Sequence, residues 1–186
     1  MLGLIIGGVI VVILLVILML VVSSFNRFKT LKNGAESTLA QIKVALKKRL
    51  DMITQLVDTT KSYANYEKET LAGVTEMRSR VGKVTAPKDL GDIGTQSRKI
   101  LDNIIAVMEA YPDLKAQENV KELMKAIQDI ETEVSRHRYV YNNIVQEYNT
   151  KTEVIPSNIV ANLFNFKRLD YLEFEEEISE RPDTSW

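Results

Sequence analysis

The sequence has 186 residues, a net charge of −1 and no cysteine. The lack of cysteine excludes disulfides, thiol nucleophiles and thiolate metal sites. The slightly acidic balance, and the lack of aromatic residues interleaved with the basic ones, argue against a nucleic-acid-binding protein. Most of the chain has the length of one ordinary domain.

An unbroken apolar run extends from Leu2 to Val22, without a charged residue or a proline. At about 1.5 Å per residue this run gives ~31 Å of helix, which matches the ~30 Å hydrocarbon core of a bilayer. The alternative is a cleaved signal peptide, which has a basic leader and a shorter apolar segment. No Lys or Arg precedes Arg27. We therefore predict a transmembrane anchor in residues 1–24.

Residues 25–34 form a basic juxtamembrane segment that contains Arg27, Lys29 and Lys32. Positive charge that follows an apolar span marks the cytoplasmic side. We therefore expect a single-pass protein of the cell membrane with its N-terminus outside and its C-terminal body in the cytoplasm. These three residues are expected to contact anionic lipid headgroups, which act over a Debye length of ~8 Å. The cluster 47–49 is expected on a solvated helix face.

The first amphipathic helix is predicted from Gly34 to about Arg80, a length of ~70 Å. Its apolar stripe consists of Leu39, Ile42, Leu46, Leu50, Ile53, Leu56, Val57, Tyr63, Leu71, Val74 and Met77. Gly34 either hinges this helix to the anchor or lies inside one continuous helix, at a cost of about 1 kcal/mol.

Two further long helices and one short helix are predicted. The second long helix begins near Asp92 and ends at Tyr111, before Pro112. The third begins after Pro112-Asp113 and ends near Thr152. The short helix occupies 157–166, with Ser157-Asn158 as its N-cap. Residues 167–186 carry seven acidic and three basic side chains, and we expect a mobile acidic tail there.

The predicted fold is therefore all-α, with an N-terminal single-pass transmembrane helix followed by an antiparallel long-helix bundle in residues 35–166. The second helix is too short to cover the stripes of the other two, so either the 157–166 segment or a second copy of the chain must cover the excess. A homo-oligomer is expected, although an antiparallel bundle within one chain gives a similar heptad pattern. The candidate interface is the heptad of the third helix: Val120, Leu123, Ile127, Ile130, Val134 and His137.

The sequence shows no catalytic, cofactor or metal constellation. His137 has Glu133 one turn earlier, but a di-iron bundle requires a glutamate three residues before the histidine, where this chain has Val134. A hydrogen-bonded interior histidine is favoured. Gly91-Asp92-Ile93-Gly94 lacks the lysine of a P-loop and is interpreted as a linker with a helix cap. We therefore expect neither a cofactor nor an enzyme.

Two Tyr-Asn dipeptides, Tyr141-Asn142 and Tyr148-Asn149, lie one heptad apart. Both tyrosines fall on the apolar stripe, where each hydroxyl needs a partner. Gln41, Arg49 or Arg138 would supply these partners in a structural polar layer that sets the helix register. A ligand pocket is the alternative.

The chain resembles the LemA family along nearly all its length. The most specific block is Glu109-Ala110-Tyr111-Pro112-Asp113-Leu114-Lys115-Ala116, followed by Glu118-Asn119. The other matching blocks are Gln41-Ile42, Leu46-Lys47-Lys48-Arg49, Asp51-Met52-Ile53, Leu56-Val57, the two Tyr-Asn dipeptides, Pro156-Ser157-Asn158, Phe166-Lys167 and Tyr171. The resemblance implies a prokaryotic protein with a membrane helix, an outside N-terminus and a cytoplasmic helical bundle. It implies no established activity.

These observations lead to one main hypothesis and two alternatives. The main hypothesis is a non-enzymatic, membrane-anchored scaffold that self-associates at the cytoplasmic face, with membrane lipids as partners. The first alternative is a membrane-tethered adaptor or sensor that binds one cytoplasmic protein. The second is a bundle enzyme with a buried polar site, which a change of His137 would test.

Overall fold

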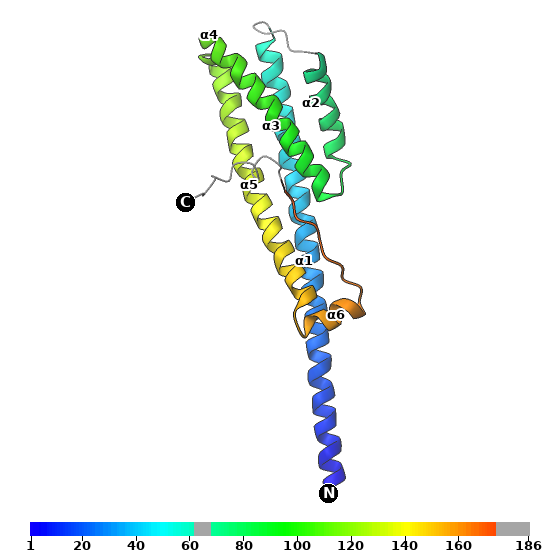
Figure 1. Ribbon diagram of the computed structural model, residues 1–186. Coiled ribbons are helices and arrows are strands. Elements are labelled where there is room, and N and C mark those ends of the chain that lie inside the picture. Colours follow the sequence, from blue (N-terminus) through cyan, green and yellow to red (C-terminus); the bar gives the residue numbers. More distant parts are fainter. Residues whose placement is uncertain (62–67, 174–186) are drawn as a thin grey trace, which may run out of the picture. The chain divides into compact units, whose positions relative to one another are not determined.

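A computed structural model describes residues 1–61 and 68–173, except for the side chains of 68–71. The fold is all-α, as predicted, and the described residues form six helices (Figure 1). These are α1 (Leu2–Thr60), α2 (Lys68–Val81), α3 (Pro87–Ala110), α4 (Pro112–Lys115), α5 (Glu118–Glu153) and α6 (Ser157–Leu163). The chain divides into unit 1 (Met1–Ser37 and Asn142–Leu169) and unit 2 (Thr38–Tyr141 and Asp170–Trp186).

Helix α1 continues through Gly34 without a break, so the hinge alternative is wrong. A Cβ atom at Gly34 would meet Ile144 Cδ1 at 3.6 Å, which shows how closely this glycine approaches α5. In unit 1, residues further along α1 contact residues that come earlier in α5. Arg27 contacts Glu147, whereas Gly34 lies against Ile144. The two helices are therefore antiparallel, as predicted.

The apolar stripe predicted for 34–80 is divided between two helices. Helix α1 ends at Thr60, and α2 begins at Lys68. Arg78 Nε lies 2.6 Å from Asp51 Oδ1, whereas one straight helix would separate these residues by ~40 Å. The chain therefore reverses between α1 and α2, and the prediction of a single rod to Arg80 is wrong. No glycine or proline occurs in residues 61–67 to signal this reversal.

Helix α3 begins earlier than predicted. Pro87 occupies its first turn after the extended N-cap residue Ala86, because proline at this position loses no helical hydrogen bond. Gly91 and Gly94 are buried inside the helix, so the interpretation of this segment as a linker is wrong. The Ser97 hydroxyl donates a hydrogen bond of 2.9 Å to the Gly94 carbonyl.

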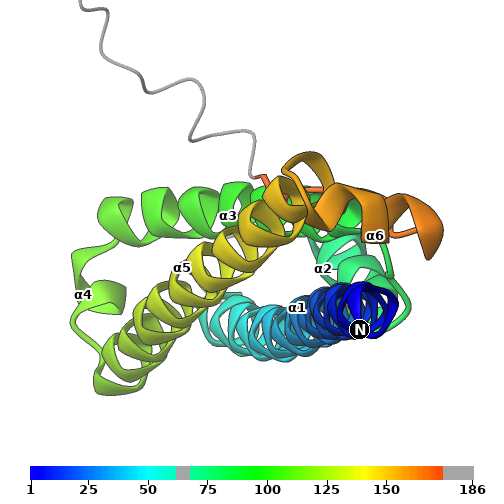
Figure 2. The same ribbon diagram turned by 90° about the horizontal axis from the view of Figure 1, so that it is seen from below.

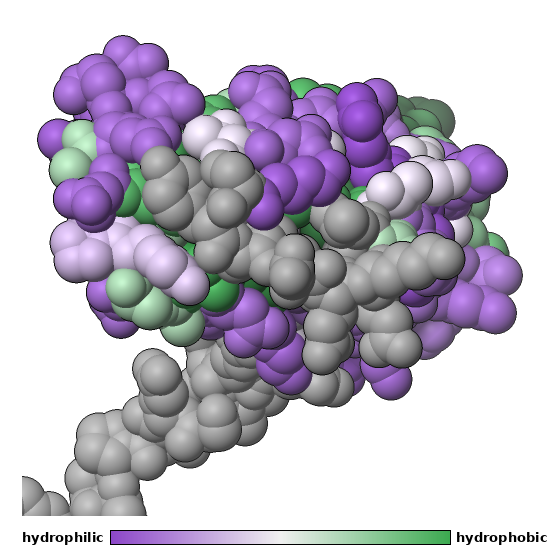
Figure 3. Space-filling model, turned by 90° about the horizontal axis from the view of Figure 1, so that it is seen from above, coloured by the Kyte–Doolittle hydropathy of each residue, from purple (hydrophilic) through white to green (hydrophobic). Residues whose placement is uncertain are grey.

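The core of unit 2 forms where the predicted stripes meet. The buried members of the first stripe are Ile42, Leu46, Leu50, Ile53, Leu56, Val57, Val74 and Met77. From α3 and α5 come Ile93, Ile104, Met108, Val120, Ile127 and Val134. Leu39 is only half-buried, and the side chains of Tyr63 and Leu71 lie outside the described residues. Figure 3 shows hydrophilic residues over much of the face of unit 2 that is in view.

The C-terminal part of the described chain is held by hydrogen bonds. Helix α5 ends at Glu153 and α6 covers Ser157–Leu163, close to the predicted elements. Ser157 is not the N-cap, because Pro156 occupies that position. The Ser157 hydroxyl instead donates to the carbonyls of Lys151 and Val154. Residues 167–173, which the sequence assigns to the acidic tail, include the buried Leu172. The rest of that tail, 174–186, lies outside the described residues.

Candidate functional site

The anchor is the most exposed apolar part of the described chain. Nearly all large apolar side chains from Leu2 to Val22 are exposed in the structure, for example Leu4 at 83% and Met19 at 76%. Among the described residues, α1 is the one helix long and apolar enough to cross a bilayer. Exposed apolar surface on this scale is costly in water, and a helix satisfies its own backbone groups in lipid.

An aromatic cluster follows the anchor in unit 1. Phe28 stacks on Phe166 at 4.7 Å between ring centroids and meets Tyr148 edge-on at 5.4 Å. Leu31 and Ala161 complete its buried part. Residues from α1, α5 and α6 thus share one core directly after the apolar run, so the anchor is joined to a packed structure.

The three residues predicted to contact lipid differ in their surroundings. Arg27 is partly exposed and forms a bidentate ion pair with Glu147, with contacts of 2.6–2.9 Å. The Lys29 amine lies 5.7 Å from the Phe25 ring centroid and 5.8 Å from that of Phe166. Lys32 is exposed. The charge of Arg27 is therefore shared with a partner in the chain, whereas Lys29 combines an exposed cation with an aromatic platform.

The Tyr-Asn dipeptides hold the chain that follows α6. In unit 1 the Asn149 side chain donates to the Leu169 carbonyl and accepts from the Leu169 N–H, each at 2.9 Å. In unit 2 the Tyr141 hydroxyl donates to the Asp170 carbonyl at 2.9 Å. Burial, and to a smaller extent Asp170, raises the pKa of Tyr141 to about 12. Burial also raises the pKa of Tyr148.

The residues predicted for one polar layer are divided between the two units and differ in burial. Tyr148 belongs to unit 1, whereas the other four belong to unit 2. Gln41 is exposed and Arg138 is half-buried. The partner of Tyr141 is a backbone carbonyl that comes 29 residues later in the sequence, which side-chain spacing alone does not reveal.

Arg49 is buried, with 1% of its side chain exposed, so its placement on a solvated face is wrong. Its Nη1 atom lies 2.9 Å from Glu131 Oε2, and Arg98 Nη1 lies 3.8 Å from Glu131 Oε1. Glu131 thus links a buried cation on α1 to an exposed cation on α3. A buried guanidinium needs such partners, because desolvating a charge is expensive.

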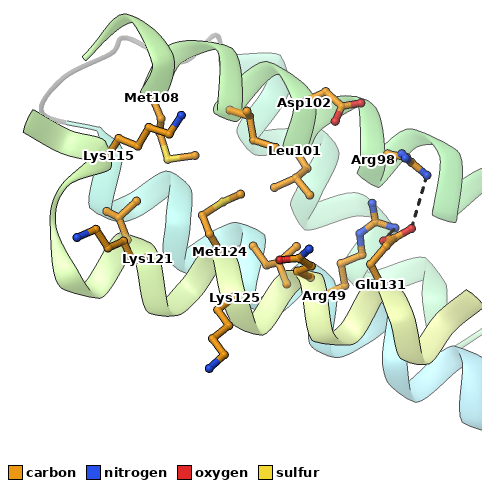
Figure 4. A pocket seen from close by; sticks show the side chains of 14 residues that line it. Arg49, Arg98, Leu101, Asp102, Met108, Lys115, Lys121, Met124, Lys125 and Glu131 are labelled. Carbon is orange, nitrogen blue, oxygen red and sulfur yellow. Dashed lines mark ion pairs between the residues drawn. The ribbon is translucent and has the colours of Figure 1, made fainter. Parts of the chain in front are cut away.

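A groove of about 590 Å³ opens beside this ion-pair network in unit 2. Its apolar lining consists of Leu101, Ile105, Met108, Val120, Met124 and Ile127. Its basic residues are Arg49, Arg98, Lys115, Lys121 and Lys125, against the acidic residues Asp102 and Glu131. Figure 4 shows Met108, Met124 and Leu101 between the two flanking helices, with the Lys125 amine directed away. An apolar floor bordered by the exposed basic residues Arg98, Lys115 and Lys121 suits a partner that has both apolar and acidic groups.

The candidate interface on α5 is largely used within the chain. Val120, Ile127 and Val134 are at most 2% exposed, so they leave no surface for a second copy. Leu123, Ile130 and His137 are half-buried. His137 Nε2 lies 3.6 Å from Glu133 Oε1, which is the one-turn pairing expected from the sequence. Of the interface predicted on this heptad, Val120, Ile127 and Val134 are therefore used inside the bundle, whereas Leu123, Ile130 and His137 keep part of their surface.

The comparison with known proteins adds a family. A family model described as LemA family matches residues 38–186. The chain belongs to the LemA family. The match begins after the anchor and the basic segment, so the membrane assignment rests on this chain's own apolar helix.

Curated relatives include both LemA and magnetosome proteins. Protein LemA of Metamycoplasma hominis is 28% identical over 131 residues, which cover 70% of this chain and 60% of the relative. Magnetosome protein MamQ 2 of Paramagnetospirillum magneticum is 22% identical over 175 residues, covering 80% of this chain and 64% of the relative. MamQ of Magnetospirillum gryphiswaldense is 21% identical over 173 residues, which cover 79% of this chain and 64% of the relative. The chain thus spans less than two thirds of the length of these relatives.

The structure gives a physical role to the most specific LemA-like block. Pro112 begins α4 immediately after Tyr111, and Leu114 is fully buried. The Asn119 side chain accepts a hydrogen bond from the Val120 N–H at the start of α5. In this LemA family chain the block therefore builds the turn between α3 and α5, one wall of the groove.

Replacing Glu131 with Gln should destabilise the protein by about 3 kcal/mol, because the buried Arg49 loses a charged partner. Urea unfolding of the full chain in detergent, followed by circular dichroism, measures this change. Glu133→Gln, which alters a half-buried glutamate two residues away, should change stability by no more than about 0.5 kcal/mol. Equal stability of Glu131→Gln and the wild type would show that the pair does not support Arg49.

Replacing Tyr141 with Phe should cost about 1 kcal/mol at pH 8, where the hydroxyl donates to Asp170. Between pH 10 and about 12 the unfolded tyrosine loses its proton while the folded one keeps it. Stability of the wild type therefore falls as pH rises, and Tyr141→Phe lacks this loss. Unfolding measured from pH 8 to pH 11 should show the gap between the two proteins closing, with the exposed Tyr139→Phe as control. A gap that is constant with pH would contradict the raised pKa of Tyr141.

Proposed function

We propose that this LemA family chain is a non-enzymatic scaffold, anchored by α1, that self-associates at the cytoplasmic face of the cell membrane. The observation that carries the proposal is the continuity of α1. One helix contains the exposed apolar run and then residues buried in the helical bundle. Membrane attachment and the helical body are therefore parts of one secondary-structure element, without a linker between them.

The orientation is supported by the distribution of positive charge. Arg27, Lys29 and Lys32 follow the apolar run, and no Lys or Arg precedes it. This asymmetry favours the cytoplasm for everything after the anchor.

Cysteine labelling in intact cells tests this orientation, and the native chain has no cysteine to interfere. A membrane-impermeant maleimide should label Leu2→Cys in intact cells and Lys83→Cys only after lysis, because Lys83 is an exposed residue of unit 2. Labelling of Lys83→Cys in intact cells would contradict the cytoplasmic assignment. Labelling of the denatured protein is the control that shows that both cysteines can react with the maleimide.

Self-association is supported by the effect of anchoring. Confining copies to a membrane raises their local concentration, so weak contacts become effective. Surface for such contacts is present in unit 2 beyond the α5 heptad, since Val44 is 56% and Tyr139 69% exposed. Apolar side chains of this size on the surface are available to a second copy.

The mass of the full chain in nanodiscs and in mild detergent tests self-association. We expect a multimer in both, and weaker association after Val44→Ser with Tyr139→Ser, because these changes remove exposed apolar surface. Lys83→Ser is the matched control, since it changes an exposed polar residue. A monomer in both environments would refute the scaffold.

A second candidate function is an adaptor that binds one cytoplasmic protein, and the groove in unit 2 favours it. Its apolar floor and its excess of basic over acidic lining residues suit an acidic, partly apolar segment of such a partner. A monomer that co-purifies with one dominant protein from crosslinked cells would favour this candidate over the scaffold.

A further inference from the structure

Helix α6 has two apolar faces, and one is left uncovered in the structure. Val160 and Ala161 are buried on the inner face. Ile159 and Leu163 of α6 are 64% and 71% exposed, and Ile155, which lies two residues before α6 begins, is 81% exposed. A spacing of four residues places Ile159 and Leu163 on one side of the helix. These two side chains, together with the exposed Ile155 just before the helix, are what we call the α6 outer row.

The α6 outer row lies in the same unit as the anchor and near its end. Phe164, which follows α6, meets Phe25 of α1 with ring centroids 4.8 Å apart. Phe25 comes three residues after Val22, the last residue of the apolar run. At 1.5 Å per residue, Phe25 lies only ~4.5 Å beyond that run. The contact therefore ties the end of α6 to the level at which the anchor leaves the bilayer.

That level corresponds to the headgroup region. A bilayer of ~40–45 Å with a ~30 Å hydrocarbon core has an interface of about 5–7 Å on each side. The views along two axes agree that α6 extends sideways from α1 (Figures 1 and 2). Seen from the N-terminal end, α6 lies beside α1 with no other part of unit 1 in front of it (Figure 2).

The charges around α6 fit the same environment. Lys29 holds its amine over Phe25 and Phe166, the two rings next to Phe164. Lys32 and Lys167 are exposed in this unit. Aromatic and basic side chains beside an apolar row are typical of segments that lie in the membrane interface.

We propose that the α6 outer row is a second membrane contact that rests in the interface of the bilayer crossed by α1. The α6 outer row contacts the boundary between the lipid headgroups and the acyl chains. The contact rests on the proposed membrane anchoring, and it fixes unit 1 against rotation about the anchor. A single helix through a bilayer does not provide such a constraint, because it turns freely about its own axis.

Site-specific fluorescence in nanodiscs tests the contact with the full chain. Single cysteines at Ile159, at Val16 in the anchor and at Val44 in unit 2 each carry an environment-sensitive dye. The quencher is a phosphatidylcholine with a nitroxide near the top of its acyl chain. We expect strong quenching at Val16 and at Ile159, and several-fold weaker quenching at Val44, an apolar residue that is 56% exposed.

A second measurement guards against an effect of the label itself. The dye is placed on Asn162, an exposed residue of α6, in the wild-type background and with Ile155→Ser, Ile159→Ser and Leu163→Ser together. These three side chains are exposed, so the substitutions should leave the fold intact. Quenching at Asn162 should fall several-fold in the triple variant.

The outcomes separate the two proposals. Quenching at Val16 without quenching at Ile159 would overturn the α6 contact and leave the anchor in place. Loss of quenching at both positions would overturn membrane anchoring itself. Energy transfer between copies labelled at Ile159, without lipid quenching, would assign the row to a second copy of the chain and overturn the bilayer contact.

Discussion

The structure depends on one constraint, the uninterrupted backbone hydrogen bonding of α1 from its apolar beginning to its buried end. An apolar run of this length has no core to enter in the described chain, and its side chains remain exposed. In a bilayer every backbone group of the span is satisfied within the helix itself. Because the helix does not stop at Gly34, the same element supplies Phe28 and Leu31 to unit 1 and Ile42 and Leu46 to unit 2.

The elements that pack against α1 determine which surfaces each unit presents. In unit 1, the Arg27–Glu147 ion pair and the rings of Phe28, Tyr148 and Phe166 hold α5 and α6 against the first part of α1. Asn149 then fixes the following chain at Leu169. In unit 2, Glu131 supports the buried Arg49 next to a groove with a basic rim. Each unit thus presents a surface that is built around contacts with α1.

Features with a regular sequence period could be predicted from the sequence, whereas features that depend on chain reversals could not. The apolar run predicted a helix long and apolar enough to cross a bilayer, and the heptad predicted a helix, α5, on which Val120, Ile127 and Val134 are buried. The reversal after Thr60 has no glycine or proline to mark it, so the stripe of α1 and α2 appeared continuous. Pairs such as Asp51 with Arg78 exist only because of that reversal.

The site residues show the same limit. Arg49 lies in a basic cluster typical of a solvated face, and only its pairing with Glu131 across the bundle explains its burial. The groove combines residues from α1, α3, α4 and α5, which no single segment reveals. For α6 the pattern correctly indicated an apolar helix, but apolar residues on both sides do not show which side the chain covers. The structure shows which side is uncovered, because Ile155, Ile159 and Leu163 are exposed.

The most direct test of the account is the distance between spin labels at Ser23→Cys and Ser37→Cys, measured for the full chain in nanodiscs. Both residues are exposed on α1 and lie on either side of Gly34. A continuous helix predicts a narrow distribution near ~21 Å, from 1.5 Å per residue. A broad distribution, or one centred well below that distance, would show that the anchor and the bundle are joined by a flexible hinge and would contradict the account.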